Sequence, residues 1–256
     1  MSDHLLVDDD GPVRVLTINR PHARNAISAA LGEALHEAIA AADADRAVRC
    51  LVITGAGDRA FSAGGDLKEI AASAAPQIES GARVITRALR HRPAKPFVAA
   101  VNGLAYGGGL ELVLACDLAV SAAHATFALP EVRRGLIASG GGLVHLPRVV
   151  GPRRALQLIL TGTPIDALTA LDWGLVNDVV PSGTELAAAV ELAHVIAGNA
   201  PLSVRCSKET ALAALTATQH DGWRLSNAAF ATVRESPDSK EGPRAFAEGR
   251  PPVWSG

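Results

Sequence analysis

Short runs of apolar residues, each closed by a turn-forming residue, recur along the first half of the chain. Within each run the apolar residues are nearly continuous, which is typical of strands that are covered on both faces. The sequence therefore predicts four buried strands. They are "VRVLTIN" (13–19), "CLVITG" (50–55), "PFVAAVNG" (96–103) and "DLAVSA" (117–122).

Helical periodicity separates the first two of these runs. In "ISAALGEALHEAIAAADAD" (27–45) an apolar residue recurs every four positions, the spacing of an amphipathic helix. A second helix is expected around residues 79–92, ending before Pro93. Strands that alternate with helices indicate an α/β fold. The recurring apolar residues of the first helix are Ile27, Leu31, Leu35 and Ile39.

The strand pattern stops after about residue 185, and only helical patterns follow. They are punctuated by Pro201 and Gly222. We therefore expect an α/β core, residues 1–195, and a C-terminal helical region, residues 196–256. Apolar residues at helical spacing in the stretch after residue 185 predict an interface, because a small appendage could not bury them on itself. These residues are Leu186, Val190, Ala193 and Ile196.

Composition narrows the class of protein. The 256 residues carry a formal net charge of −2 without blocks of like charge, which argues against binding to nucleic acid or to an anionic membrane. The N-terminus lacks the apolar core of a signal peptide, and no apolar run is long enough to span a membrane, so a cytoplasmic protein is expected. Three widely spaced cysteines, Cys50, Cys116 and Cys206, predict free thiols.

Several familiar chemistries lack their sequence patterns. Neither G-x-G-x-x-G after a strand nor a P-loop pattern occurs, and Ser139 is not flanked as a nucleophile elbow. The eight histidines are scattered, and His145 is expected to be structural. A hydrolytic triad stays possible, but nothing marks one. The sequence therefore predicts neither a metal site nor a nicotinamide cofactor.

Three ordered motifs carry the candidate chemistry: "AFSAGGDLKE" (60–69), "NGLAYGGGLELVLACD" (102–117) and "FALPEVRRGLIASGGG" (127–142). The first two follow predicted strands and place glycines before a helix. Such turns let backbone N–H groups approach a ligand closely, and the helix N-terminus adds positive potential. Two of them can direct two N–H donors at one oxygen, which is the arrangement of an oxyanion hole.

Glu111 stands alone as a carboxylate in the apolar second motif. It could lie on the wet side of a half-exposed helix, or it could belong to a reaction site. It lies three positions after Gly108, so on a helix it shares a face with the glycine turn. Together with Glu131 of the third motif, this order of features favours a reaction site.

In their order and spacing the three motifs resemble the crotonase superfamily, also called the enoyl-CoA hydratase/isomerase family. The resemblance covers the whole chain, from "LTINRPHARNAIS" (16–28) to "LDWGLVNDVV" (171–180) and the tail "EGPRAFAEGRPPVW" (241–254). It implies a spiral of ββα units followed by a C-terminal helical region that forms a homotrimer or a dimer of trimers. In this chain Phe246 would then lie near a coenzyme A pocket.

The resemblance also assigns roles to positions of this sequence. Gly65 and Gly108 would supply the two N–H groups that hold the thioester oxygen, and Glu111 and Glu131 would be the catalytic pair found in the hydratases of the family. The implied activity is reversible addition of water to an α,β-unsaturated acyl-CoA, where coenzyme A is part of the substrate and no cofactor is required. The segment implied to line the CoA site comprises Ala63, Gly65, Asp66, Leu67, Lys68 and Gly108.

The segment after Glu131 departs from the straight-chain hydratases, in which it forms the wall of the acyl pocket. Its "GGLVHLP" form is similar to carnitinyl-CoA dehydratase-like members. Gly249 stands where many relatives have a lysine that reaches CoA, and Arg250 is a candidate substitute. Isomerisation, carnitinyl-CoA dehydration, decarboxylation and thioester hydrolysis stay open as alternative reactions, and so does a non-catalytic acyl-CoA-binding or RNA-binding role.

Overall fold

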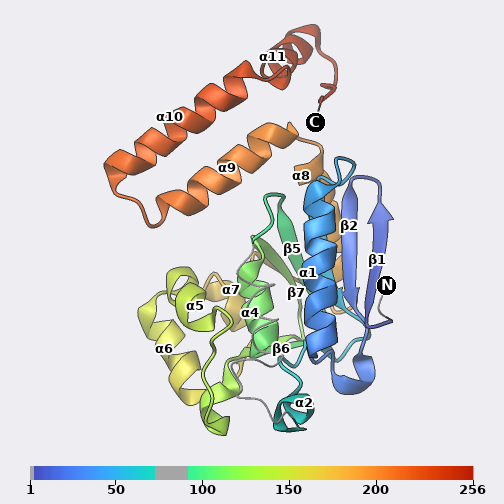
Figure 1. The fold of residues 1–256 in the computed structure, drawn as a ribbon, viewed down its shortest axis with the longest axis vertical. Coiled ribbons are helices and arrows are strands. Elements are labelled where there is room, and N and C mark those ends of the chain that lie inside the picture. Colours follow the sequence, from blue (N-terminus) through green and yellow to red (C-terminus); the bar gives the residue numbers. More distant parts are fainter. Residues whose placement is uncertain (1–2, 73–91, 256) are drawn as a thin grey trace.

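The computed structural model describes residues 3–72 and 92–255 and contains two sheets (Figure 1). The larger sheet has the strand order β1-β2-β3-β5-β7-β10, and the smaller has the order β4-β6-β8-β9. All neighbouring strands are parallel except β1 with β2 and β8 with β9. The strands are β1 Leu5–Asp10, β2 Val13–Ile18, β3 Cys50–Gly55, β4 Ala60–Ser62, β5 Phe97–Val101, β6 Leu104–Tyr106, β7 Leu118–Ala122, β8 Thr126–Ala128, β9 Ile165–Asp166 and β10 Asp178–Val180.

Helices follow the strands and then dominate the C-terminal part. Two short 3-10 helices are η1 Pro21–Ala23 and η2 Pro130–Arg134. The α-helices are α1 Ala29–Ala44, α2 Leu67–Ala72, α4 Gly108–Ala115, α5 Gly142–Val150, α6 Pro152–Thr161, α7 Ala167–Asp172, α8 Glu185–Ala197, α9 Pro201–Ala214, α10 Gln219–Glu235 and α11 Asp238–Glu248.

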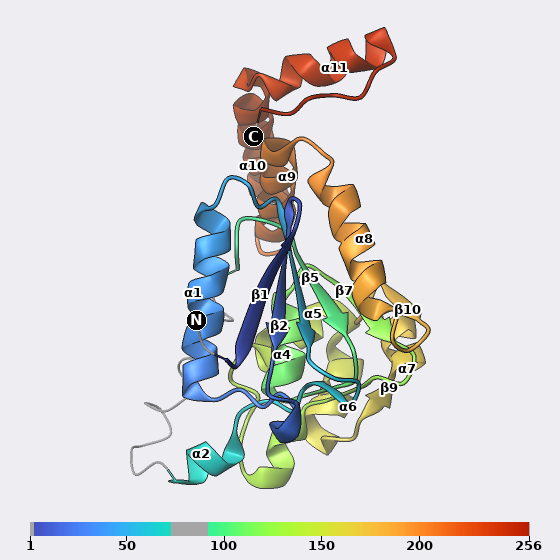
Figure 2. The ribbon, with the colours of Figure 1, turned by 90° about the vertical axis from the view of Figure 1, so that its right-hand side faces the viewer.

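The four predicted strands are confirmed as β2, β3, β5 and β7, and they are buried on both faces. Along β3, Leu51 and Ile53 enter the main core, while Cys50 and Val52 enter a second core on the other face. Helix α1 covers the first face and α8 the second (Figure 2). Continuous apolar runs were therefore the correct signal for these strands.

Helix α1 is confirmed with almost the expected bounds. Ser28 is its N-cap, and the Ser28 side chain accepts a hydrogen bond from the Leu31 N–H. The helix expected around residues 79–92 lies almost entirely outside the described residues. Strands β1, β4, β6, β8, β9 and β10 were not predicted, and five of them have only two or three residues.

The expected spiral of ββα units is present. Each of three turns adds one strand to the larger sheet and the next strand to the smaller one, and a helix follows. The successive units are β3-β4-α2, β5-β6-α4 and β7-β8-η2. Because β4, β6 and β8 are parallel neighbours, their carboxyl ends lie at one edge, where the three motifs meet.

No strand of the described chain follows β10, as predicted, but α8 is not part of a free appendage. Its residues Ala189, Ala193 and Ala197 are buried against the larger sheet. Of the residues that were interpreted as an interface, Val190, Ala193 and Ile196 therefore pack in the core against the sheet, whereas Leu186 is exposed. The division at residue 195 falls inside α8 and stays a prediction.

Helices α9, α10 and α11 extend away from the sheets (Figure 1). Pro201 begins α9 as expected, but Gly222 does not punctuate the chain, because Thr218 caps α10 and the helix runs through the glycine. No described helix is by itself long and apolar enough to cross a membrane. Helices α8 and α9 satisfy that criterion only as a pair, bent by 107°.

Candidate functional site

The two predicted glycine turns meet at the edge where β4 and β6 end. A Cβ atom built on Gly64 would lie 2.8 Å from the Gly108 nitrogen, and one built on Gly108 would lie 3.5 Å from the Gly65 nitrogen. Gly64 has φ +87° and Gly107 has φ +54°, conformations that L side chains rarely adopt. Glycine is therefore needed at Gly64 and Gly107 for the turns, and at Gly64 also for their close approach.

The N–H groups of Gly65 and Gly108 are open donors. Within the part of the chain that the structure describes, neither donates a hydrogen bond. Gly108 is the first residue of α4, where helical N–H groups have no partner in the helix and the dipole is positive. The two predicted residues thus lie together and can bind one partly negative oxygen.

Glu111 lies one turn further along α4 and is buried, with 5% of its surface exposed. The Gly142 N–H donates a hydrogen bond to Glu111 Oε1 at 3.0 Å. Burial raises the pKa of Glu111 to about 7, and the charge of Glu131 adds to the rise, although N–H groups of residues 140–142 oppose it. The solvated-face interpretation of Glu111 is therefore wrong.

Glu131 extends from η2 to the same site. Its Oε1 would lie 3.0 Å from a Cβ built on Gly107, so the carboxyl group lies against the second glycine turn. Its Oε2 is buried and has no hydrogen-bond partner among the described residues. Burial raises the pKa of Glu131, and the positive charge of Arg134 partly opposes the rise.

In the predicted CoA segment, Asp66 is held by an ion pair and a hydrogen bond, whereas other residues are exposed. Asp66 pairs with Arg20 at 3.0 Å and accepts the Lys68 N–H at the start of α2. Desolvation raises the pKa of Asp66, but these contacts outweigh it, so the pKa lies below its usual value. Ala63 is half-buried, whereas Leu67 and Lys68 are exposed at the surface beside the glycine turn.

Gly142 is the functional residue that sequence reasoning missed. Residues 140–142 were interpreted as part of an acyl-pocket wall, yet their N–H groups face the carboxylate of Glu111. A Cβ on Gly142 would lie 3.2 Å from Glu111 Oε1 and 2.8 Å from Ala138 Cβ. Three consecutive glycines before a helix were a usable signal, because they form the same kind of turn as the two motifs that were recognised.

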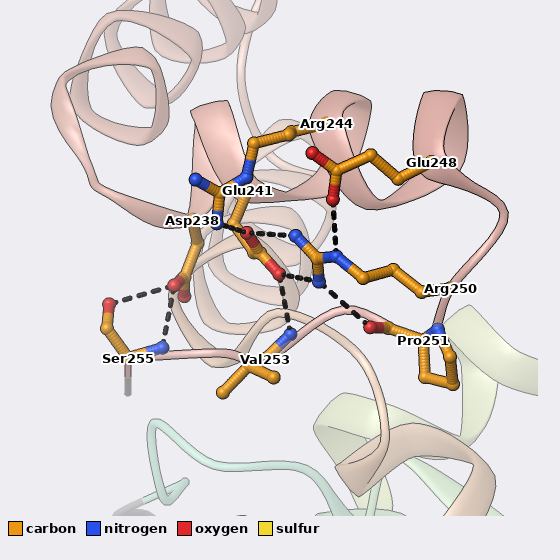
Figure 3. Close-up of polar contacts among 8 residues, drawn as sticks. All are labelled: Asp238, Glu241, Arg244, Glu248, Arg250, Pro251, Val253 and Ser255. Carbon is orange, nitrogen blue, oxygen red and sulfur yellow. Dashed lines mark hydrogen bonds and ion pairs between the residues drawn. The ribbon is translucent and has the colours of Figure 1, made fainter.

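Arg250 has internal partners. Its guanidinium binds Glu241 through contacts of 2.6 and 3.1 Å and Glu248 at 2.6 Å (Figure 3). Glu241 also accepts the Val253 N–H. This network folds the tail back onto α11, so Arg250 is occupied within its own chain.

No group of three or more His, Cys, Asp or Glu side chains in residues 3–72 and 92–255 could hold a metal ion.

Comparisons with known proteins identify the family of the chain. The family model of enoyl-CoA hydratase/isomerase matches residues 9–256. The chain is 39% identical to a carnitinyl-CoA dehydratase of Salmonella enteritidis PT4 over 261 aligned positions, which cover all of both chains.

Solved structures show the same fold over the whole chain. An enoyl-CoA hydratase from Bacillus anthracis is 36% identical, with 99% of each chain covered and a TM-score of 0.96. An enoyl-CoA hydratase from Mycobacterium tuberculosis H37Rv is 38% identical, with 100% of each chain covered and a TM-score of 0.92. Family model, sequence relatives and fold agree, and the chain belongs to the enoyl-CoA hydratase/isomerase family, the crotonase superfamily.

Proposed function

We propose that this protein is an enoyl-CoA hydratase-type lyase that reversibly adds water to the double bond of an α,β-unsaturated acyl-CoA thioester. The observation that supports it most is the placement of two carboxyl groups with raised pKa, Glu111 and Glu131, beside the open N–H groups of Gly65 and Gly108. Hydration needs both sets of groups: the N–H groups bind the thioester oxygen, and the carboxyl groups transfer protons to and from water and substrate.

The oxygen of the thioester would be held by the two N–H groups. As water attacks Cβ, electrons move onto the carbonyl oxygen and form an enolate. Preorganised donors stabilise that charge, and loss of one donor typically costs about 3 kcal/mol. The positive end of α4 acts on the same oxygen because Gly108 is its first residue.

The two carboxyl groups would share one proton. The ionised group takes a proton from water as the new C–O bond forms, and the protonated group delivers its proton to Cα as the enolate collapses. Burial and mutual repulsion favour such a mixed state, because two neighbouring carboxylates cannot both ionise cheaply.

The CoA moiety would lie along the segment from Ala63 to Lys68, with Leu67 and Lys68 available at the surface. Asp66 holds this segment in place through its ion pair with Arg20.

We propose no metal and no nicotinamide in the reaction. Dialysis against a chelator is expected to leave turnover unchanged, and activity that is lost and then restored by a metal ion would contradict this.

We also propose a homotrimer or a dimer of trimers. Helix α10 has no buried residue, and Trp223 and Phe230 on it are each 65% exposed. Phe246 on α11 is 90% exposed. Large apolar side chains on an extended pair of helices are typical of a subunit interface.

The test is an assay of the protein with crotonyl-CoA and with longer enoyl-CoA thioesters. We expect the conjugated double bond to lose its absorbance as the 3-hydroxyacyl-CoA forms, without release of free CoA thiol. Movement of the double bond would identify an isomerase, and thiol release a hydrolase. Binding of the thioesters without any turnover would identify a non-catalytic acyl-CoA-binding protein.

The dehydratase relatives suggest carnitinyl-CoA as a second candidate substrate. Its acyl group carries a quaternary ammonium, which proteins bind with aromatic rings. Of the nine aromatic residues in the chain, Phe61, Phe97 and Phe127 are enclosed in the core and Trp173 lies beside Arg154. Only Tyr106 adjoins a glycine turn, and the remaining four belong to the C-terminal helices and tail. We therefore expect uncharged enoyl-CoA to be turned over faster than the carnitine thioester.

A further inference from the structure

Lys208, on α9, holds a buried polar contact that the proposed reaction does not use. Its Nζ lies 2.6 Å from Asp117 Oδ2, 2.7 Å from the Pro93 carbonyl oxygen and 2.8 Å from the Lys95 carbonyl oxygen. Three acceptors match the three protons of an ammonium group. The side chains of Lys208 and Asp117 are only 12% and 15% exposed. All three donors of the ammonium group are therefore used in a poorly solvated ion pair, while Asp117 Oδ1 is buried without a hydrogen-bond partner among the described residues.

Asp117 connects this ion pair to the active-site helix. It follows α4 after the single residue Cys116. Its Oδ2 also accepts the Phe97 N–H at 2.9 Å, and its own N–H donates to the Phe97 carbonyl oxygen at 2.8 Å. Asp117 thus fastens the C-terminal end of α4 to the start of β5.

Helix α4 is short and rigidly enclosed. All eight of its residues are buried, its first residue is Gly108, and Glu111 lies in its first turn. A closely packed helix moves as one body, because its side chains have no free volume in which to readjust. A shift at the Asp117 end would therefore move the Gly108 N–H and the Glu111 carboxyl group together.

Lys208 also joins α9 to the core through its hydrogen bonds and ion pair. Among the described residues, Lys208 makes every hydrogen bond and ion pair from an α9 side chain to the core. Pro201, at the start of α9, is its single buried residue. The same helix packs against α10, which carries the exposed apolar face proposed for assembly.

We propose that Lys208 is a positioning residue. Through Asp117 it sets the location of α4, and so it couples the placement of the C-terminal helices to the geometry of the oxyanion site and of Glu111. This inference rests on the proposed function for its turnover readout, but the geometry of the oxyanion site can be measured independently of turnover.

The experiment compares Lys208→Met, the double variant Lys208→Met with Asp117→Asn, and the control Lys240→Met, whose side chain is exposed on α11. Turnover is measured together with the midpoint of thermal unfolding and the mass in light scattering. The carbonyl stretching frequency of bound butyryl-CoA with an isotopically labelled carbonyl reports the strength of the oxyanion site.

We expect Lys208→Met to lower kcat about 10²-fold with KM within about threefold, because small misplacements act on the reacting geometry. It should also weaken the carbonyl shift and lower the unfolding midpoint. The double variant leaves no buried charge unpaired, so its unfolding midpoint should recover while kcat and the carbonyl shift stay low. Lys240→Met should match the wild type.

Two outcomes would overturn the inference: wild-type kcat in Lys208→Met, or recovery of kcat together with the unfolding midpoint in the double variant. The second would mean that Lys208 acts on stability alone. If the wild type hydrates no enoyl-CoA, the proposed function fails, and the carbonyl shift alone then decides the role of Lys208.

Discussion

Two opposing effects determine the pKa of the Glu111 carboxyl group. Burial favours its protonated form, whereas the N–H groups of residues 140–142, with Gly142 at 3.0 Å, favour its ionised form. The result is a pKa of about 7, where a group can both take up and release a proton near neutral pH. At Glu131 the N–H group that opposes the rise in pKa is its own, and its Oε2 has no partner among the described residues.

Replacement of either glutamate by glutamine tests the proposed acid–base roles. Glu111→Gln and Glu131→Gln keep the shape of the side chain but cannot transfer a proton. We expect each to lower kcat for hydration about 10²–10⁴-fold while CoA binding persists. Glu37→Gln, at an exposed position of α1, is the control. Near-wild-type turnover in either active-site variant would exclude a catalytic role for that residue.

The raised pKa of Glu111 also predicts how stability depends on pH. The usual value of 4.5 applies to the unfolded chain and about 7 to the folded protein, so the folded state binds the proton more tightly. The contribution of Glu111 to stability is therefore complete below pH 4.5 and is lost as pH rises through 7.

Glu111→Gln removes this loss. Relative to the wild type, its free energy of unfolding should increase between pH 5 and pH 8 by up to about 3 kcal/mol. Chemical denaturation of both proteins at the two pH values measures the difference. A difference that is the same at both values would mean that Glu111 ionises normally in the folded protein.

At the scale of elements, two strand-to-helix turns approach so closely that a Cβ atom at Gly64 or Gly109 would overlap backbone atoms of the neighbouring segment. Gly109 illustrates the limit, because a Cβ there would lie 2.2 Å from the Ser62 carbonyl oxygen. The N-terminus of α4 thus rests directly on the end of β4. This contact brings the N–H groups of Gly65 and Gly108 together.

Gly64→Ala tests the contact between the turns. Its Cβ would lie 2.8 Å from the Gly108 nitrogen and 2.6 Å from the Tyr106 carbonyl oxygen, so the oxyanion site should widen and kcat should fall about 10²-fold or more. Gly174→Ala is a matched control, since Gly174 has φ +74° with no atom within 4 Å of an added Cβ. If both variants lose the same modest stability and keep turnover, the close approach is not needed for catalysis.

At the scale of the whole molecule, α10 and α11 present large apolar side chains to solvent in the single chain. We expect that truncation before Ser236 abolishes both assembly and activity. Phe230→Asp should lower the mass in light scattering, because a charge would be buried at the interface. Leu168→Asp changes a similarly exposed residue on α7 and should leave the mass unchanged. A wild-type monomer at micromolar concentration with full activity would refute the proposed assembly.

Local patterns in the sequence determined much of this protein. Buried strands such as β3 need apolar residues on both faces, and α1 needs a cap at Ser28 and a stripe at helical spacing, so each could be predicted from adjacent residues. The glycine turns within residues 60–69 and 102–117 were predicted for the same reason, because turn chemistry depends on the residues within the turn, and the family resemblance then selected Gly65 and Gly108. Very short strands of the smaller sheet carry too few residues for such a pattern.

Contacts between distant segments were decided only by the tertiary structure. Gly142 reaches Glu111 across 31 positions, and Lys208 reaches Asp117 across 91. The face of α8 could have met a partner or the sheet, and only packing showed that Ala193 covers the sheet. A sequence records which side chains can bury, donate or accept, whereas the choice of partner depends on how all the elements pack together.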